Sequence, residues 1–435
     1  MELREFIGFE FYEERDFKET ELGLLPQDWQ LVRLGEVCEK PQYGYTTNAI
    51  NNSTGVKFLR ISDIQDNKVN WSLVPYCHIS EKEIYRYILK PLDILVARIG
   101  ATTGKTFIIS ECPKAVFASY LIRLRVKSDR ILNPNFLFYF TNTKIYWKQI
   151  NSSKGGRLKQ GINIPNIQNL LIPLPPLPEQ KAIACVLSTI QEAKEKTEAV
   201  IKATIELKKS MMKHLFSYGV YKENIESDEW KIGNPETVRV KETEIGTIPE
   251  HWQVVRFEEC INSKEKYKVG KIKQKDYKPI GMFPIIDQSQ NFIVGFCNDK
   301  NYLFDGELPV IIFGDHTRVF KYVDFHFVCG ADGVKIIIPN KKKVMPKFFY
   351  YALTNLNIPN RGYNRHYSIL KNQYIPLPPL PEQKAMANIL QAIDEKIQKE
   401  EAKKKALENL FKSLLHNLMS GRIRVKYLGG NHETN

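Results

Sequence analysis

The sequence predicts two globular α/β (α+β) domains separated by a pair of long antiparallel, coiled-coil-like helices, arranged as a pseudo-two-fold tandem repeat. Three observations lead to this prediction: a length of 435 residues, a nine-residue motif that occurs twice, and a long helix-forming segment after each copy. One hydrophobic core rarely organises a chain of this length, so two or more domains are expected. The composition, with 43% hydrophobic and 26% charged residues, is typical of a folded globular protein.

The repeated motif marks the end of each half of the chain. The sequence LPPLPEQKA at residues 174–182 recurs letter for letter at residues 377–385. A second match opens each half, since residues 20–29 resemble residues 243–252 and both segments end in tryptophan. Between these markers the halves differ in length and in most residues. We therefore expect a shared structural frame that carries two different surfaces.

Each copy of the motif leads into a predicted long helix. Residues 179–216 and 382–419 contain no Pro or Gly and are rich in Ala, Glu, Lys and Leu. At 1.5 Å per residue, each helix would be about 57 Å long. The proline run could bind a proline-recognising domain, but it more simply fixes the entry of the helix and ends the preceding strand.

A stripe of apolar or long-stemmed residues with 4,3 spacing runs along each helix and predicts that the two helices pack on each other. In the first helix the stripe contains Ile183, Leu187, Ile190, Lys194, Thr197, Ile201, Thr204, Lys208, Met211 and Leu215. In the second helix it contains Met386, Leu390, Ile393, Ile397, Glu400, Lys404, Leu407, Phe411, Leu414 and Leu418.

A weaker match lies inside the two halves, where residues 134–139 correspond to residues 346–351. Both segments are predicted to begin a helix with Pro in its first turn. The predicted organisation is a first globular domain at 1–173, a proline motif and central spacer helix at 174–219, a linker and second globular domain at 220–376, a proline motif and C-terminal spacer helix at 377–425, and a tail at 426–435.

The charge and cysteine content indicate the kind of partner and compartment. Lys and Arg outnumber Asp and Glu by 63 to 49, and a net charge of +14 favours a polyanionic partner such as nucleic acid. The seven cysteines are scattered and form no CxxC pair, so neither a disulfide framework nor a zinc cluster is expected, and a reducing cytoplasm fits. Residues 1–20 lack an apolar core and no apolar run is long enough to span a bilayer, so we expect neither secretion nor membrane insertion.

Two motifs resemble catalytic sites but are incomplete. Residues 99–106 (IGATTGKT) end like a phosphate-binding loop, yet Ile99 stands where the first glycine is required, and residues 107–109 are predicted to form a strand instead of a helix. Residues 133–136 (NPNF) approach the loop with which adenine methyltransferases hold the target amino group. Their counterpart in the second half begins with Met345, which cannot accept that hydrogen bond. The histidine spacing gives no metal-ligand pattern. We therefore predict no catalytic residue and no metal site in this chain.

The duplicated motif at the head of two long helices, between two dissimilar α/β segments of a basic chain, closely resembles the specificity (S) subunit family of type I restriction-modification systems. Residues 93–101 also look like part of the first domain of this family. The resemblance covers essentially the whole chain. It implies two target-recognition domains, each of which recognises one half of a bipartite target in double-stranded DNA, and two helices that set the spacing of the half-sites and dock the methyltransferase (M) subunits.

The resemblance also implies that this cytoplasmic chain is not itself an enzyme. Adenine methylation would use AdoMet held by the M subunits, and cleavage would need an ATP- and Mg-dependent restriction/translocase (R) subunit. Two alternatives remain: a DNA methyltransferase or nuclease that acts on its own, and a protein scaffold that does not bind DNA.

Candidate DNA-contacting residues lie in polar turns and in glycine-containing loops, whose side chains can contact phosphates or base edges. One such loop, residues 154–163, stands just before the proline motif, where the family is expected to have a DNA-facing loop. The candidates of the first domain are Arg60, Arg98, Thr102, Thr103, Lys105, Lys154, Arg157, Lys159, Gln160 and Asn163.

The second domain offers three groups of similar chemistry: a lysine-rich run at residues 264–278, a polar turn after the strand-like residues 310–313, and a loop at residues 360–367 that corresponds to the loop of the first domain. The candidates of the second domain are Lys268, Lys271, Lys273, Asp315, His316, Thr317, Arg318, Arg361, Asn364, Arg365 and His366.

Overall fold

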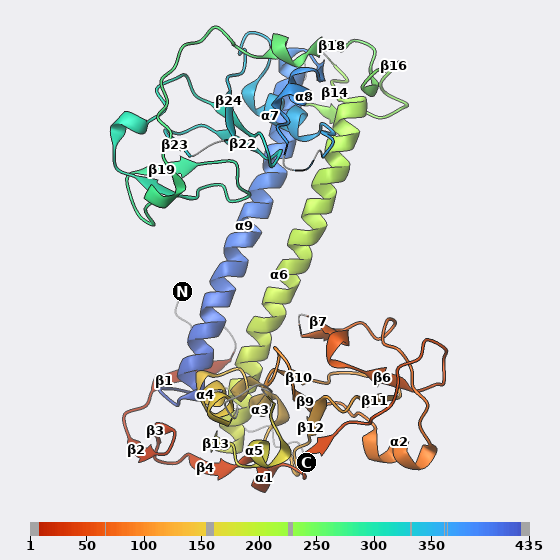
Figure 1. Cartoon of the computed structure of the whole chain (residues 1–435), viewed down its shortest axis with the longest axis vertical. Coiled ribbons are helices and arrows are strands. Elements are labelled where there is room, and N and C mark those ends of the chain that lie inside the picture. Colours follow the sequence, from red (N-terminus) through yellow and green to blue (C-terminus); the bar gives the residue numbers. More distant parts are fainter. Residues whose placement is uncertain are drawn as a thin grey trace. The chain divides into compact units, whose positions relative to one another are not determined.

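The computed structural model describes residues 8–65, 67–153, 161–224, 229–330, 333–360, 362 and 364–427. The chain divides into two compact units, the first formed by Met1–Thr197 with Lys403–Asn435 and the second by Glu198–Ala402. Each unit contains one globular domain and about half of each long helix (Figure 1).

The first unit consists of short helices and paired strands around one end of the long helix pair. Its elements are β1 (Phe9–Glu13), β2 (Phe17–Thr20), β3 (Gly23–Pro26), β4 (Gln30–Arg33), α1 (Leu34–Val37), β5 (Gln42–Tyr43), β6 (Lys57–Leu59), β7 (Ile64–Gln65), β8 (Lys68–Val69), α2 (Glu81–Tyr87), β9 (Ile94–Ala97), β10 (Thr106–Ile108), β11 (Ala115–Phe117), β12 (Leu121–Leu124), α3 (Pro134–Phe140), α4 (Lys144–Ser153), α5 (Ile164–Gln168), β13 (Leu171–Leu174) and β26 (Ile423–Tyr427).

The second unit follows the same order with fewer helices in its described part. Its elements are β14 (Val220–Tyr221), β15 (Lys231–Ile232), β16 (Val240–Thr243), β17 (Gly246–Pro249), β18 (Gln253–Arg256), β19 (Phe283–Ile286), β20 (Gly295–Cys297), β21 (Val310–Gly314), β22 (Phe320–Val323), β23 (Val328–Cys329), β24 (Val334–Ile337), α7 (Pro346–Thr354), α8 (Tyr367–Lys371) and β25 (Tyr374–Leu377).

The strand pairings of the two units correspond. In the first unit β2 pairs with β3, β4 with β13, β6 with β11 in parallel, and β9 stands between β10 and β12. In the second unit β16 pairs with β17, β18 with β25, β19 with β23 in parallel, and β21 stands between β22 and β24. The strand that follows each long helix also pairs alike, β26 with β1 and β14 with β15. The predicted tandem repeat and the α/β fold class are therefore confirmed.

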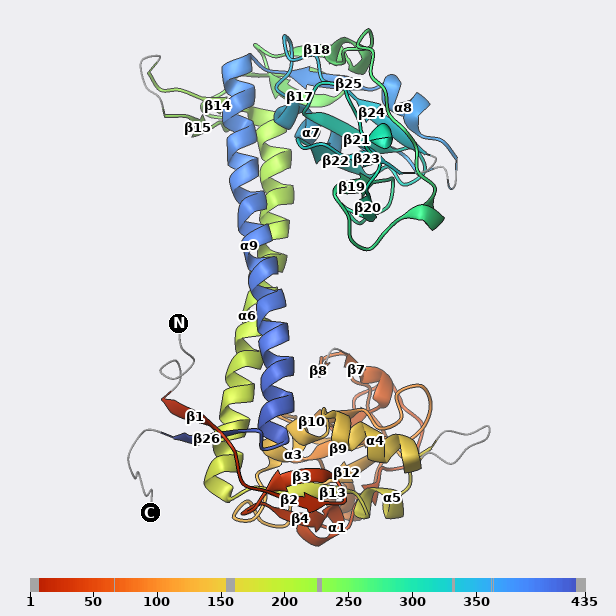
Figure 2. The same ribbon diagram turned by 90° about the vertical axis from the view of Figure 1, so that its left-hand side faces the viewer.

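The two predicted long helices are confirmed. α6 spans Leu177–Tyr218 and α9 spans Leu380–Met419. Every residue of the predicted 4,3 stripe on both helices is buried or half-buried. In the first unit the beginning of α6 packs against the end of α9, and in the second unit the end of α6 packs against the beginning of α9, so the pair is antiparallel (Figures 1 and 2).

The central strand of each domain separates two hydrophobic cores. In β9, Ile94 and Val96 face a core that includes residues of the long helices, whereas Leu95 faces a second core around β11. In β21, Ile311 and Phe313 likewise face the helix-containing core, and the other face belongs to a separate core. The alternation follows from the two-residue period of a strand. Each domain thus has a frame core next to the helices and a second core on the other face of its central strand, beside a smaller cluster in the same divergent part.

A buried glutamine attaches α6 to the first domain. The side chain of Gln180 is fully buried, and its Oε1 accepts a hydrogen bond of 2.8 Å from the Asn133 amide. Its Nε2 donates to the carbonyl oxygens of Ile131 at 3.0 Å and Pro175 at 2.8 Å. One amide group therefore joins the start of the helix to the segment that precedes α3.

The second copy of the motif forms the same bonds. The side chain of Gln383 is fully buried, and its Oε1 accepts from the Met345 amide at 2.7 Å. Its Nε2 donates to the carbonyl oxygens of Lys343 at 3.0 Å and Pro378 at 2.8 Å. Both Asn133 and Met345 directly precede a helix that begins with proline, as predicted for residues 134–139 and 346–351.

The neighbouring glutamate of the first motif takes part in a buried ionic cluster. Arg424 is 6% exposed and its guanidinium donates to Glu179 at 2.6 Å, to Asp28 at 2.8 Å and to Glu14 at 2.5 Å. Burial alone would lower the pKa of Arg424, but the hydrogen bonds to Glu179 and Asp28 and the charge of Glu179 raise it above its ordinary value. The Trp29 indole also donates to Glu179 at 3.1 Å, so this cluster fastens β26 to the opening segment of the chain.

Substitution of the buried glutamine tests its contribution to stability. Gln383→Met keeps the length of the side chain but leaves a backbone amide and two carbonyls without their partner. We expect the free energy of unfolding to fall by about 3 kcal/mol. Gln391→Met on the same helix is the matched control, because Gln391 is exposed, and it should change the value by less than about 0.5 kcal/mol. Chemical denaturation of the full chain measures both variants, and equal losses would contradict the role of Gln383.

Substitution of the buried arginine tests the ionic cluster. Arg424→Met leaves three carboxylates without their cation, so we expect a loss of about 3–5 kcal/mol in the stability of the first unit. Lys426→Met is the control in the same strand, because Lys426 pairs with Glu10 at an exposed site. Hydrogen exchange of the β1 and β26 amides in both variants measures the effect, and unchanged protection in the Arg424 variant would refute it.

Candidate nucleic-acid interface

The turn between β9 and β10 carries several of the predicted contact residues of the first domain. Thr103 Oγ1 donates to the carbonyl of Gly100 at 2.7 Å, and the Gly104 amide donates to Ala97 at 2.8 Å. Gly100 and Gly104 have φ values of +83° and +91°, which favour glycine. Thr103 is buried and shapes the turn, whereas Lys105 is exposed at its end.

The glycine of the GKT sequence has a packing role. A Cβ atom on Gly104 would lie 2.7 Å from the Ile150 side chain and 3.2 Å from Trp147, both on α4. The Tyr146 hydroxyl, also on α4, donates to the Gly104 carbonyl at 2.9 Å. The next element is the strand β10, as the sequence predicted. The phosphate-loop-like sequence is therefore explained by the contact between this turn and α4.

The turn lies beside the end of the predicted glycine-containing loop. Gly161 forms an antiparallel bridge with Ile99, and the Ile162 amide donates to the Arg98 carbonyl at 2.9 Å. The Arg98 guanidinium carbon lies 4.3 Å from the centre of the Tyr43 ring. The Tyr43 hydroxyl in turn accepts from the amide that begins α5 at 3.2 Å. The fold thus brings together two of the predicted contact segments of the first domain.

The turn after β21 occupies the equivalent place in the second domain. Thr317 Oγ1 donates to the Gln288 carbonyl at 2.5 Å, and the His316 amide donates to Gln288 Oε1 at 3.2 Å. Arg318 has a φ of +62° and donates to the Ile358 carbonyl at 2.9 Å. Gln288 follows β19, so the shape of this turn depends on a residue about thirty positions earlier in the chain.

A buried aspartate joins this turn to the loop before α8. Asp315 is 2% exposed, and its Oδ1 accepts from the amides of His366 at 2.9 Å and Tyr367 at 2.7 Å. The buried His366 ring also contacts the Asp315 carbonyl through Nδ1 at 2.9 Å. Asn364 and Arg365 of the same loop are exposed. The second domain therefore repeats the juxtaposition of turn and loop that the first domain shows.

The remaining candidates fall into three classes. Arg60 makes a two-fold ion pair with Asp63, with contacts of 2.7 and 3.0 Å, and Asn163 caps α5 through its side-chain oxygen, so both have structural partners. Thr102 is half-buried, and the three lysine candidates of the second domain are exposed. The candidates outside the described residues are Lys154, Arg157, Lys159, Gln160 and Arg361.

Several residues at these sites were not predicted from the sequence. Tyr43 supports Arg98, and the exposed Tyr120 accepts the Arg98 amide at its carbonyl. Gln288 holds the turn of the second domain, and Lys335 lies 4.0 Å from Asp315. These contacts join segments far apart in the chain, and no local pattern marks them.

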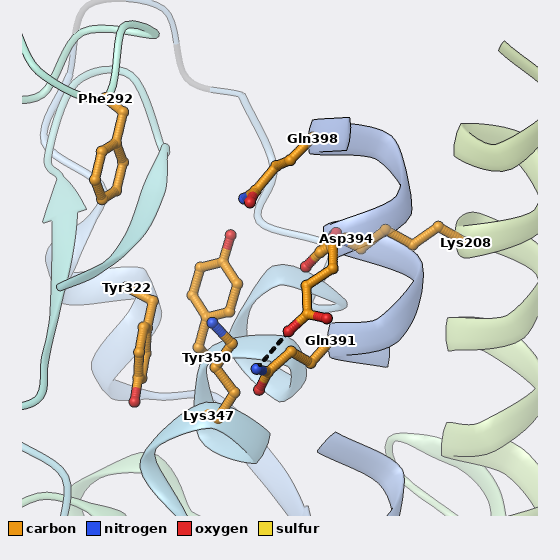
Figure 3. A pocket seen from close by; sticks show the side chains of 9 residues that line it. Lys208, Phe292, Tyr322, Lys347, Tyr350, Gln391, Asp394 and Gln398 are labelled. Atoms are coloured by element: carbon orange, nitrogen blue, oxygen red, sulfur yellow. Dashed lines mark hydrogen bonds and ion pairs between the residues drawn. The ribbon is translucent and has the colours of Figure 1, made fainter. Parts of the chain in front are cut away.

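A polar pocket of about 370 Å³ opens in the second unit between α9, the end of α6 and the domain (Figure 3). The Lys347 amine lies 4.1 Å from the centre of the Tyr322 ring, and burial lowers its pKa. Lys208 pairs with Asp394 at 2.5 Å. The residues that line the pocket are Lys208, Phe292, Tyr322, Lys347, Tyr350, Gln391, Asp394, Glu395 and Gln398.

At two of the corresponding positions the first unit has phenylalanine, Phe138 for Tyr350 and Phe411 for Lys208. Phe138 and Tyr139 stand where the second repeat has Tyr350 and Tyr351, and Tyr139 packs on Phe411 with ring centres 6.1 Å apart. Phe411 matches Lys208 in the aligned helices. The second repeat thus has a lysine that pairs with Asp394 where the first repeat packs an aromatic ring.

Two general features of the described residues bear on function. No group of three or more His, Cys, Asp or Glu side chains among them could hold a metal ion. No helix within the described part combines the length and apolar character needed to cross a membrane.

Comparison with known proteins identifies the family. The family model for the "Type I restriction modification DNA specificity domain" matches this chain twice, over residues 26–207 and 249–409. The chain belongs to this family. The two matched segments correspond to the two structural repeats, and the resemblance noted from the duplicated motif is confirmed.

Similar proteins of this family match over almost their whole length. The chain is 30% identical to the MjaX type I restriction enzyme specificity subunit of Methanocaldococcus jannaschii, covering 97% of this chain and 99% of that protein. It is 27% identical to the MjaVIII specificity subunit of the same organism, with the same coverage. The crystal structure of the type I restriction-modification S subunit from M. genitalium matches with a TM-score of 0.60 and 16% identity, covering 90% of this chain and 96% of that one, which shows the shared fold.

Substitution of Asp315 tests how the turn and loop of the second domain are joined. Asp315→Ala removes the acceptor of the Tyr367 amide and one of the two acceptors of the His366 amide, which also donates to the Asp315 carbonyl. We therefore expect faster hydrogen exchange, chiefly at residue 367, and a loss of about 2 kcal/mol in local stability. Asp324→Ala is the control, because Asp324 is exposed on the same domain. Hydrogen-exchange mass spectrometry distinguishes the two, and unchanged exchange in the Asp315 variant would show that other contacts hold the loop.

Proposed function

We propose that this chain is the DNA sequence-specificity subunit of a type I restriction-modification complex. Each globular domain recognises one half of a bipartite target in double-stranded DNA. The long helices set the spacing of the half-sites and dock the M subunits. The observation that carries this proposal is the double match to the specificity domain, with one frame that supports two dissimilar surfaces.

The proposed DNA contacts come from the cations and amides next to each turn. In the first domain the half-buried Arg98 side chain lies against the Tyr43 ring, and this contact reduces the side-chain entropy that is lost when it binds. In the second domain Asn364 and Arg365 stand on the loop that Asp315 fixes. Thr103, Asp315 and His366, which the sequence placed among the contact residues, are buried, and we assign them the role of positioning these segments.

We further propose that methylation and cleavage belong to partner subunits in the cytoplasm, with AdoMet on the M subunits and ATP and Mg on the R subunits. The catalytic-looking motifs of this chain have structural roles that support this division. Gly104 of the GKT sequence packs on α4. Asn133 of the NPNF sequence caps α3, where its side chain accepts from the Phe136 amide at 3.0 Å, and its own amide is bound by Gln180.

Mapping of methylated adenines tests the proposal. Cells that express this chain with its M subunits should methylate adenine in one bipartite sequence, and the isolated chain should transfer no methyl group from AdoMet. Methylation by the isolated chain would favour a self-sufficient methyltransferase. The absence of sequence-specific DNA binding by the assembled complex would favour a protein scaffold.

Single substitutions assign each half-site to its domain. Arg98→Ala and Arg365→Ala should each weaken binding to the mapped target by about 1–3 kcal/mol, and each should relax specificity in one half-site. Arg130→Ala and Arg239→Ala are matched controls, because both residues are exposed on the same domains away from the turns. Fluorescence anisotropy against duplexes mutated in either half-site measures the effect. Losses spread equally over both half-sites would contradict the assignment.

A further inference from the structure

Two apolar side chains project from the lysine-rich part of the second domain. Ile280 is 83% exposed and Met282 is 68% exposed, and they flank Gly281 just before β19. We name the pair Ile280 and Met282 the apolar tip. Single exposed hydrophobic residues are common on protein surfaces, but a pair with this exposure on one short turn needs a reason.

The backbone of the apolar tip is fixed. The Lys278 amide and carbonyl exchange hydrogen bonds of 3.0 and 2.8 Å with Phe296 of β20. The Met282 amide donates to Asn298 Oδ1 at 2.8 Å, and a Cβ on Gly281 would approach that oxygen to 2.7 Å. The backbone on both sides of the tip is therefore held by β20 and the residue that follows it, while the two side chains are exposed. A rigid display of this kind reduces the entropy cost of binding.

The charge around the apolar tip indicates its partner. Three exposed lysines, Lys273, Lys275 and Lys278, stand within the seven residues before Ile280, and Lys271 is exposed as well. Such a run favours a polyanion and disfavours an ordinary apolar protein surface. Lysines that bind phosphates bring neighbouring side chains to the bases, where apolar groups contact thymine methyls or insert between base steps.

We propose that the apolar tip is a base-contacting element of the second domain, flanked by lysines that bind the phosphates. The inference rests on the proposed function and adds to it a contact that is neither ionic nor polar. Met282 and Asp287 stand at the two ends of β19, about 17 Å apart for five extended residues, and the residue after Asp287 holds the turn at residues 315–318. This distance corresponds to about five base pairs, so the tip would contact bases that the turn does not reach.

Substitution of the apolar tip in the full chain, assembled with its M subunits, tests the proposal. On a duplex that carries the mapped target, Ile280→Ser with Met282→Ser should weaken binding about ten-fold, which corresponds to about 1.4 kcal/mol. The dependence of affinity on salt should stay unchanged, because no charge is removed. Lys273→Gln, Lys275→Gln and Lys278→Gln together should instead lower the salt slope by roughly 2.7.

Leu24→Ser with Leu73→Ser is the matched control, because these leucines are 61% and 78% exposed in the first unit outside the lysine run. This control should bind like the unsubstituted complex. Equal melting temperatures of the two double variants show that folding is intact. Unchanged affinity of the Ile280 and Met282 variant overturns the proposal.

Two modified duplexes separate the forms of base contact. Deoxyuridine in place of thymidine in the second half-site and its flanks should weaken binding of the unsubstituted complex if methyl groups are contacted. A rise in 2-aminopurine fluorescence at one step should appear if the tip opens the stack. Either signal, lost in the tip variant, supports the proposal, and the absence of both overturns it even if affinity falls. Failure of the unsubstituted complex to bind the mapped target removes the proposed function itself, which is a distinct result.

Discussion

A buried amide at the start of each long helix is the interaction on which the rest of the structure depends. The side chains of Gln180 and Gln383 each accept a hydrogen bond from the backbone amide of the residue that precedes a proline-initiated helix. The corresponding distances agree within 0.1 Å between the two repeats. A buried backbone group without a partner costs about 1–3 kcal/mol. A rotation of the helix relative to its own domain would break the three hydrogen bonds of the glutamine and would therefore cost several kcal/mol. This explains why the glutamine is identical in two repeats that otherwise diverge.

The residue before each glutamine shows how far the frame tolerates change. Glu179 accepts the Trp29 indole and pairs with Arg424. Glu382 instead accepts the Val220 amide at 3.2 Å and contacts the His251 ring at 2.9 Å. The two carboxylates occupy the same position in the motif but bind different groups, an arginine in one unit and a histidine in the other. The two repeats therefore share a buried glutamate as hydrogen-bond acceptor at this position, although the groups that donate to it differ.

The sequence predicted the elements that depend on local patterns. The two long helices, their packing stripes, the strands β10 and β21 and the proline-started helices α3 and α7 all agree with the structure, because period, capping and proline chemistry act within a few residues. The motif letters were recognised as a repeat, but not the bonds of Gln180, whose partner Asn133 lies 47 positions away.

The candidate site follows the same rule. The correspondence of turn and loop in the two halves was visible in the order of the segments along the chain. The support of Arg98 by Tyr43 and of Thr317 by Gln288 was not, since each contact joins distant segments. Burial was equally invisible, so Thr103 and Asp315 were grouped with exposed residues of similar polarity. The apolar tip left a local signal, an apolar pair around a glycine at the end of a lysine run.

The separation of the cores on the two faces of each central strand explains how one frame supports different surfaces. The central strands β9 and β21 direct alternate side chains to opposite sides. The frame core with the long helices and the core of the divergent part therefore meet at this strand and contain different side chains. In the first domain the turn is closed by its own Thr103, whereas in the second it depends on Gln288 and Asp315. Changes on the divergent side of the strand leave the glutamine bonds and helix packing untouched, because the energetic coupling between non-contacting groups is small. A recognition surface can therefore diverge at a cost confined to its own core, while the position of the helices is preserved.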